Sequence, residues 1–183
     1  DKLNLEIAPG RMSALVGKSG EGKTTIFRLL ARMHDPSSGA ITLDGKNIRD
    51  VDLRWYRKLF AIVQQDVEIF DATLEENIKY PYPDATPEEV GEAVEAAHLK
   101  AAAENKDKFP SGLKTEVGER GVRLSGGEKQ RVGIARAYLA LLKGAKVLLL
   151  DEATSDLDSE AEAAIQKMIG ELQKRQSVTI AVI

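Results

Sequence analysis

Eight consecutive residues near the N-terminus have the types and spacing needed to hold a phosphate chain. The segment Gly17–Thr24 reads GKSGEGKT, which fits the pattern G-x-x-x-x-G-K-[S/T]. Glycines let the backbone wrap closely around a phosphate, a lysine supplies positive charge for it, and a threonine hydroxyl can ligate Mg²⁺. The pattern predicts a binding site for a nucleoside triphosphate with Mg²⁺. The residues assigned to it are Gly17, Lys18, Ser19, Gly20, Glu21, Gly22, Lys23, Thr24 and Thr25.

A pair of acidic residues, Asp151 and Glu152, directly follows the apolar run Val147–Leu150. The carboxyl end of a parallel strand borders the crevice where such sheets bind their ligands. Asp151 is suited to a water-mediated contact with Mg²⁺, and Glu152 is the candidate base that polarises an attacking water. Alone, such a pair would be read as an acidic helix cap after a core strand. The phosphate-binding pattern upstream favours the catalytic reading.

A second helix start with a phosphate-binding character lies at Leu124–Glu128, which reads LSGGE. Ser125 can cap the helix, and Gly126 and Gly127 allow a close approach of the backbone to an anion. Taken alone, this pattern is more often a plain cap than a ligand site. Because one nucleotide needs only one cradle, we expect the second to face a nucleotide held by another copy of the chain.

Apolar runs and helical periodicity predict the elements that position these residues. Between the first strands, Asp44-Gly45 predicts a tight turn, and Thr86 with Glu89 forms a capping-box pattern within the middle helical region. The predicted strands are Leu3–Ile7, Arg11–Val16, Ile41–Leu43, Phe60–Val63, Val147–Asp151 and Val178–Ile183. The predicted helices run from about Lys23 to the breakers Pro36 and Gly39, over Thr73–Leu99, over Gly127–Leu142 and over Ala161–Gln173.

Composition limits the class of protein. The 183 residues suffice for one domain, and a net charge of −3 excludes a broadly basic nucleic-acid binder. The absence of cysteine and the presence of only two histidines exclude a thiolate or histidine-rich metal site. No apolar run is long enough to cross a bilayer, so we expect a soluble chain that reaches a membrane only through a partner.

The combination of motifs resembles the nucleotide-binding domain of ABC transporters. GKSGEGKT resembles the Walker A motif, LSGGE the signature motif and VLLLDE the Walker B motif, and the likeness covers essentially the whole chain. The resemblance implies an α/β P-loop ATPase core with a mostly parallel sheet and an N-terminal antiparallel β portion. It also implies a helical subdomain at about residues 72–142 within a single ATPase domain over 1–183.

The resemblance assigns roles residue by residue. Gln65 resembles the Q-loop glutamine, which contacts Mg²⁺ and couples to the transmembrane domain; Ser155–Asp158 resembles the D-loop, with Asp156 in place of the usual alanine. Glu128 stands where glutamine is commoner. The implied catalytic residues are Glu152, Lys23 and Gln65, and the implied metal ligands are Thr24, Gln65 and Asp151. ATP would also be contacted by Gln65, Asp151, Ser125, Gly126, Gly127 and Glu128.

The resemblance implies a head-to-tail dimer in which two copies enclose ATP and Mg²⁺. The segment Thr115–Gly121 resembles the loop that precedes the signature in exporters. The implied partners are a second nucleotide-binding domain and a transmembrane domain in the same polypeptide, at the cytoplasmic face of a membrane. Nucleic acid is not expected. The alternatives are a soluble ABC ATPase acting on DNA or ribosomes, and a non-catalytic nucleotide-binding module.

Both ends of the chain lie within predicted strands, which predicts that the domain continues beyond them. The resemblance places the switch histidine just after Ile183 and the adenine-stacking aromatic residue before Asp1. We therefore expect residues 1–183 by themselves to be an impaired ATPase.

Overall fold

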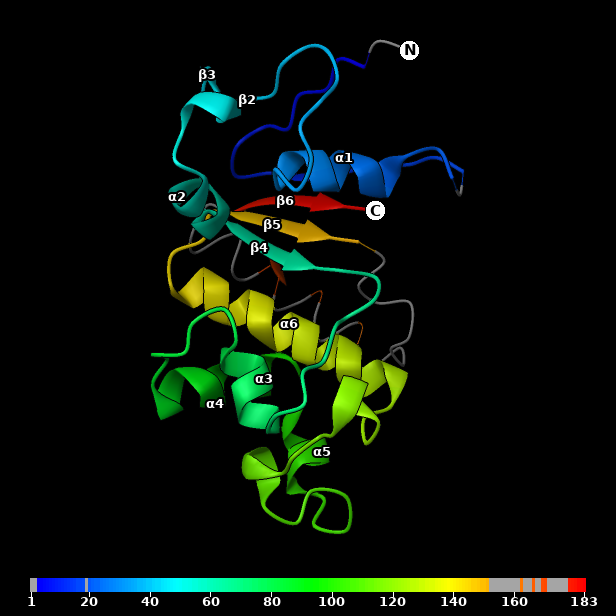
Figure 1. Cartoon of the computed structure of the whole chain (residues 1–183), viewed down its shortest axis with the longest axis vertical. Helices are drawn as coiled ribbons and strands as arrows, with labels where there is room; N and C mark the ends of the chain where they lie inside the picture. The colour runs from blue at the N-terminus through cyan, green and yellow to red at the C-terminus, as the bar shows by residue number, and fades with distance from the viewer. Residues whose placement is uncertain (1–2, 19, 152–161, 163–165, 167–168, 171–177) are drawn as a thin grey trace.

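The structure is a computed structural model, and it describes residues 3–18, 20–151, 162, 166, 169–170 and 178–183. Its centre is a four-stranded sheet in the order β1-β6-β5-β4, in which every pair is parallel. Helix α1 lies on one face of this sheet and helix α6 on the other (Figure 1). These elements are β1 (Met12–Ala14), β4 (Phe60–Val63), β5 (Val147–Leu150), β6 (Thr179–Val182), α1 (Lys23–Leu30) and α6 (Gly126–Leu142).

The unbroken apolar sequence of β5 follows from burial on both faces of the sheet. Leu149 belongs to the apolar cluster that contains Phe27 of α1, whereas Leu148 and Leu150 belong to the larger cluster on the opposite face. Alternate side chains of a strand point to opposite faces, so a strand covered on both sides needs apolar residues at every position. The predicted strand at this segment is therefore confirmed.

A small antiparallel hairpin, β2 (Thr42–Leu43) and β3 (Lys46–Asn47), forms a second sheet. Its turn residues Asp44 and Gly45 both have positive φ, 49° and 78°. Two positive φ angles are characteristic of the type I′ turn, whose twist matches that of a two-stranded hairpin. The turn predicted at Asp44-Gly45 is confirmed.

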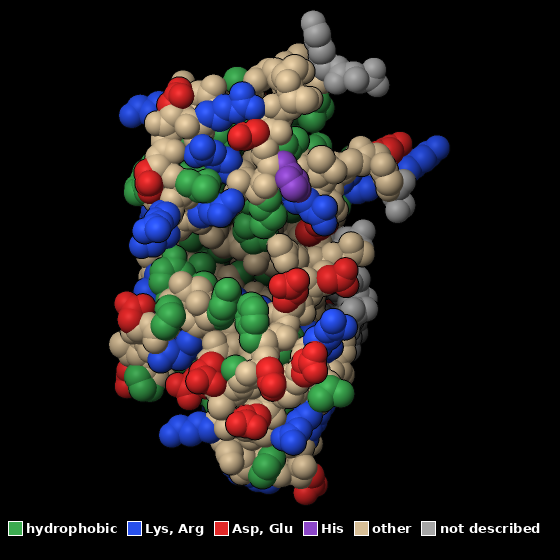
Figure 2. Space-filling view, in the orientation of Figure 1, with side chains coloured by type: hydrophobic (Ala, Val, Ile, Leu, Met, Phe, Trp, Pro, Cys, Tyr) green, Lys and Arg blue, Asp and Glu red, His purple; other side chains and the backbone are tan. Residues whose placement is uncertain are grey.

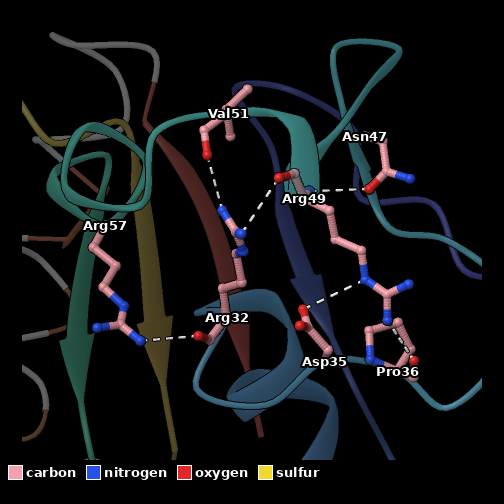
Figure 3. Close-up of polar contacts among 7 residues, drawn as sticks. All are labelled: Arg32, Asp35, Pro36, Asn47, Arg49, Val51 and Arg57. Atoms are coloured by element: carbon pink, nitrogen blue, oxygen red, sulfur yellow. Dashed lines mark hydrogen bonds and ion pairs between the residues drawn. The ribbon is translucent and has the colours of Figure 1, made fainter.

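Three arginines connect the end of α1 to the segment after the hairpin, which contains the 3₁₀ helix η1 (Ile48–Asp50) and α2 (Leu53–Lys58). Arg32 donates to the Val51 carbonyl at 3.0 Å, and Arg57 donates to the Arg32 carbonyl at 2.9 Å (Figure 3). Arg49 donates to the Pro36 carbonyl at 2.7 Å and lies 3.6 Å from the Asp35 carboxylate (Figure 3). Two of the accepting carbonyls follow the end of α1, and the Val51 carbonyl lies between η1 and α2.

A helical layer packs on the side of α6 that faces away from the sheet (Figure 1). Thr73 and Thr86 begin its first two helices with complete capping boxes. The helices are α3 (Leu74–Lys79), α4 (Pro87–Ala96) and α5 (Lys100–Glu104), and the 3₁₀ helices η2 (Gly112–Lys114) and η3 (Glu119–Gly121) follow. One apolar cluster runs from β4, β5 and β6 through α6 into these helices. The boundary of a helical subdomain at 72–142 stays a prediction.

Two predicted helices differ in the structure. The helix predicted over Thr73–Leu99 is broken between α3 and α4, where Pro81 and Pro83 cannot continue a helix. Helix α1 ends at Leu30, before the predicted breakers, because Arg32 turns into the left-handed region with φ 55°.

The segment Leu3–Ile7 was predicted as a strand, but it has no regular secondary structure. Leu3 is 65% exposed, and β1 pairs with β6 alone among the described strands. A strand requires a hydrogen-bonded neighbour, and none of the described residues provides one for this segment. The predicted helix over Ala161–Gln173 lies mostly outside the described residues, although Glu162, Gln166, Ile169 and Gly170 are helical. In the part of the chain that the structure describes, no helix is long and apolar enough to span a membrane.

Candidate nucleotide-binding site

The loop between β1 and α1 has the backbone geometry that the glycine pattern predicts. Gly20 and Gly22 have φ angles of 84° and 88°, in the left-handed region where a side chain would be strained. Gly22 occupies the N-cap position of α1 without any side-chain cap. An uncapped helix start presents backbone N–H groups and the positive end of the helix dipole to an anion.

The Lys23 side chain folds back over this loop. Its ammonium group donates to the Gly17 carbonyl at 2.8 Å and to the Lys18 carbonyl at 2.9 Å. These two carbonyls hold the positive charge over the loop rather than in free solution. The arrangement brings together the cation and the helix start, as the sequence pattern predicts.

The loop also contains a carboxylate with a contact that the sequence pattern does not anticipate. The Glu21 carboxylate accepts a hydrogen bond from the Lys18 amide at 2.8 Å. The same carboxylate oxygen lies 2.5 Å from the place where a Cβ on Gly17 would stand, so a larger residue there would displace the Glu21 carboxylate. Glu21 thus uses one backbone donor of the loop, and its expected contact with the nucleotide stays a prediction.

Thr24 and Asp151 meet at the carboxyl edge of the sheet, although they are far apart in sequence. The Thr24 hydroxyl donates to the Asp151 carboxylate at 3.2 Å. Asp151 is buried, and its amide continues the β5 ladder by donating to the Val63 carbonyl at 2.9 Å. The carboxyl ends of the strands lie on the same side as the loop that leads into α1 (Figure 1). Two separate elements therefore position this pair of oxygens.

The oxygens of Thr24 and Asp151 fit a magnesium ion, because Mg²⁺ prefers hard oxygen ligands from one or two protein groups. Among the described residues, no group of three or more His, Cys, Asp or Glu side chains could hold a metal.

A pocket of about 370 Å³ lies beside this pair, between α1 and the segment that follows β4. The face seen in Figure 2 is hollowed near its middle. Thr24, Asp151 and Gln65 all line the pocket, together with Gln64. Buried Gln130 of α6 donates to the Gln64 carbonyl at 3.3 Å, which fixes the backbone beside Gln65. The predicted site residue Gln65 therefore lies in the same pocket as the two oxygens.

The signature residues begin α6 with a complete capping box. The Ser125 hydroxyl accepts from the Glu128 amide at 3.3 Å, and the Ser125 amide donates to the Glu128 carboxylate at 2.7 Å. Lys108 forms an ion pair with the same carboxylate. Burial alone would raise the pKa of Glu128, but the Lys108 ammonium and the Ser125 amide outweigh it and hold the pKa below its ordinary value.

The start of α6 does not line the pocket that contains Thr24 and Asp151. None of Ser125, Gly126, Gly127 and Glu128 is among the residues around that pocket. The structure thus brings together the loop, Asp151 and Gln65 but not the signature. Of the predicted site residues, Ser19 and Glu152 lie outside the described residues, as does the D-loop segment 155–158.

Sequence reasoning missed a buried polar cluster next to the site. Arg136 of α6 donates to the carbonyls of Asn77 and Glu68, each at 2.7 Å, and to the Asn77 side-chain oxygen at 3.0 Å. Buried Asn77 in turn accepts from the Phe70 amide at 2.9 Å. Burial lowers the pKa of Arg136. This cluster secures the segment that follows Gln65. The sequence signal that could have revealed it is Asn77, a polar residue that shares the apolar side of a short helix with Leu74 and Ile78.

Known proteins resemble this chain in sequence and in structure. The family model described as ABC transporter matches residues 1–155. The chain is 47% identical over 97% of its length to the uncharacterised ABC transporter ATP-binding protein YwjA of Bacillus subtilis, and 48% identical over 98% to an ATP-dependent lipid A-core flippase of Thiobacillus denitrificans. A solved bacterial Atm1-family ABC exporter with ATP bound matches 98% of the chain with a TM-score of 0.88 and 40% identity.

The chain spans 30% of the length of each of these three proteins. Because the family model covers well over half of the chain and the sequence and structural matches extend over nearly all of it, the chain belongs to the ABC transporter family, as an ATP-binding domain of the exporter type.

Proposed function

We propose that this chain binds and hydrolyses Mg-ATP in a head-to-tail dimer, and that the resulting closure and opening drive export by a transmembrane domain. The observation that carries the proposal is the meeting of the Thr24 hydroxyl with the Asp151 carboxylate, beside the loop over which Lys23 is held. A cation, a helix start and a pair of hard oxygens at one edge of a parallel sheet form the set of groups that P-loop enzymes use on a triphosphate.

In this proposal each residue has a separate task. Lys23 binds the β- and γ-phosphates, and Thr24 and Asp151 hold Mg²⁺, which supplies positive charge for the phosphate oxygens when it is bound. Gln65 reaches the same metal from the adjoining segment. Glu152 orients the attacking water and accepts its proton. These assignments follow the family pattern at matching positions of this sequence.

Ser125, Gly126 and Gly127 act on the nucleotide of the second copy. Their place outside the pocket supports this division, because they do not line the cavity that contains Thr24 and Asp151 of their own chain. Closure of the two copies would exclude bulk water from the triphosphate, and loss of the γ-phosphate would remove the group that bridges them.

The transmembrane partner is proposed to belong to the same polypeptide. The matched proteins are more than three times as long as this chain, and they include a flippase and an exporter. The ATP-binding domain would then work at the cytoplasmic face of the membrane. The net charge of −3 gives no support to the alternative of a DNA-directed or ribosome-directed ATPase.

The first test is nucleotide binding by the Lys23→Ala variant, measured by calorimetry with Mg-ATP. Loss of a charge-assisted contact worth about 1.5–3 kcal/mol should weaken ATP binding at least about tenfold. Lys46→Ala, which removes an exposed lysine from the hairpin, is the matched control and should bind as the wild type does. Equal affinity for ATP in all three proteins would contradict the assignment of the loop.

The second test separates binding from hydrolysis. Glu152→Gln should bind ATP but retain it in a closed dimer, because the variant lacks the base and keeps the binding groups. ATP that stays bound through rapid gel filtration measures this closed state. Ser125→Arg in the same background should abolish retention while leaving ADP affinity nearly unchanged. ATP retention that survives Ser125→Arg would show that the signature does not act across a dimer.

A further inference from the structure

The signature motif of this chain contains a carboxylate that capping by itself does not require. The Glu128 carboxylate accepts the Ser125 amide at 2.7 Å, while the Glu128 amide donates to the Ser125 hydroxyl at 3.3 Å. A glutamine can make the same reciprocal pair of hydrogen bonds, because the capping box accepts either side chain. The additional feature of Glu128 is therefore its negative charge.

That charge has a cost if the start of α6 closes on a nucleotide. In the proposed dimer, Ser125, Gly126 and Gly127 face a triphosphate, and a nearby carboxylate would repel it. The Glu128 side chain is only 15% exposed, so water screens its charge weakly. An uncompensated carboxylate at this position would oppose the closure that the signature is proposed to make.

Lys108 compensates this carboxylate from the segment between α5 and η2. Its ammonium forms an ion pair with the Glu128 oxygen that also accepts the Ser125 amide. The backbone directly after Lys108 is fixed, because the Phe109 amide donates to the Asn105 carbonyl at 2.7 Å and the Phe109 side chain is fully buried. The lysine is thus held in place by its neighbours, unlike an isolated lysine on a mobile surface.

We propose that Lys108 is a positioning residue for the signature: it neutralises and orients Glu128, so that the start of α6 can approach the triphosphate bound by a second copy. This inference rests on the proposed ATP-bound dimer. Lys108 does not touch the nucleotide in this proposal. It acts on the nucleotide indirectly, through Glu128 and the cap of α6, and this distinguishes it from the binding residues.

The test uses the full-length protein with Glu152→Gln as the parent and measures the rate at which retained radiolabelled ATP is released. Lys108→Met keeps the apolar stem of the side chain and removes the charge. It should release ATP about tenfold faster than the parent. Lys108→Arg should release ATP at close to the parental rate. Lys106→Met is the matched control, because Lys106 is an exposed neighbour without the ion pair.

The charge argument is checked by repeating the lysine substitution with Glu128→Gln present. Without the carboxylate, Lys108→Met should no longer accelerate release, and ADP affinity should be equal in all variants because ADP does not support closure. The proposal is overturned if Lys108→Met releases ATP at the parental rate, or accelerates release equally with glutamate and glutamine at position 128. If the parent retains no ATP at all, the dimer itself is wrong, and the role of Lys108 falls with it.

Discussion

Glu21 places a negative charge in a loop that is expected to bind an anion. Its carboxylate accepts the Lys18 amide, one of the backbone donors that such a loop offers to a phosphate. A phosphate that needs this amide must displace the carboxylate and then tolerate its charge nearby. We therefore expect Glu21 to weaken anion binding by the loop, so that its substitution strengthens binding.

We predict that Glu21→Gln binds Mg-ATP several-fold more tightly than the wild type. The substitution preserves the size of the side chain and removes the charge that competes with the phosphates. Calorimetric titration with ATP measures the change, and Glu92→Gln on the exposed side of α4 is the control for loss of one negative charge. Weaker binding by Glu21→Gln would show that the carboxylate instead supports the loop in the bound state.

The site residues also show which contacts a sequence can predict. The geometry of Gly17–Thr24 could be predicted because the backbone of Gly20 and Gly22 is determined locally by their lack of a side chain. The ion pair of Lys108 with Glu128 joins residues 20 apart, and the contact of Arg136 with Asn77 joins residues 59 apart. Such contacts depend on the packing of separate helices, and no local pattern reports them.

At the scale of the elements, α6 connects the sheet to the helical layer. It packs on β4 on one side and on α3 and α4 on the other. Gly133 permits the close approach to the segment after β4, because an added Cβ would lie 2.7 Å from a methyl group of Val67. Gly91 in α4 differs, since nothing lies within 4 Å of the place where its Cβ would stand. The packing around Gly133 therefore favours glycine, whereas the open space around Gly91 would accept a larger side chain.

We predict that Gly133→Ala lowers the free energy of unfolding, whereas Gly91→Ala raises it by up to about 1 kcal/mol. Alanine favours the helix in both cases, but at position 133 the stiff Val67 side chain must move away first. Urea denaturation of the two variants beside the wild type measures both changes. Stabilisation of similar size at the two positions would show that Val67 yields without cost.

The helix caps make stability depend on acid pH. The backbone amide of Thr73 lowers the pKa of Glu76 by donating a hydrogen bond to its carboxylate. The pKa of Glu89 is lowered mainly by its hydrogen bond with Lys143 and, to a smaller extent, by the Thr86 amide. A carboxylate whose pKa is lowered by folding stabilises the folded state fully when the pH is above its pKa in the unfolded chain, about 4.3. This stabilisation is lost as the pH falls through the pKa of the folded state.

We predict that the free energy of unfolding decreases as the pH falls below about 4.5, and that Glu76→Gln with Glu89→Gln flattens this decrease. The glutamines keep the capping geometry but cannot bind a proton. Urea denaturation between about pH 6 and pH 3 gives the two curves. Parallel curves for the double variant and the wild type would assign the acid sensitivity to other carboxylates.

The elements differ in how far a sequence can locate them. The apolar run of β5 and the capping boxes at Thr73 and Thr86 are local sequence signals. The structure has a strand at the apolar run and a helix start at each capping box. The end of α1 depends on the left-handed turn at Arg32. Because arginine has no preference for positive φ, the sequence does not indicate this turn. The segment Leu3–Ile7 has a strand pattern, but a strand forms only beside a neighbour, and local sequence does not supply one.

At the scale of the whole molecule, the sheet and the helical layer share one core. The largest apolar cluster contains Ala61 and Ile180 of the sheet, Leu139 of α6 and Val90 of α4. Layers that share a core without a break cannot lose one part and keep the other intact. The two layers should therefore unfold together.

We predict a single unfolding transition with the same midpoint by far-ultraviolet circular dichroism and by the fluorescence of Trp55, the sole tryptophan. Leu139→Ala, at a fully buried position of α6, should lower stability by about 2–5 kcal/mol and shift both signals equally. A shift of one signal without the other would reveal two separate folding units.

The pairing of β1 with β6 has a consequence for synthesis on the ribosome. The Gly10 amide donates to the Thr179 hydroxyl, 169 residues later in the chain, and Met12 is in register with Ile180. At about 5–20 residues per second, the strand that leads into the phosphate loop waits about 10–30 s for its neighbour to be made. During this interval the nascent chain has no anchored ATP site and an unpaired strand edge, so a cell must shield it from other chains until β6 emerges.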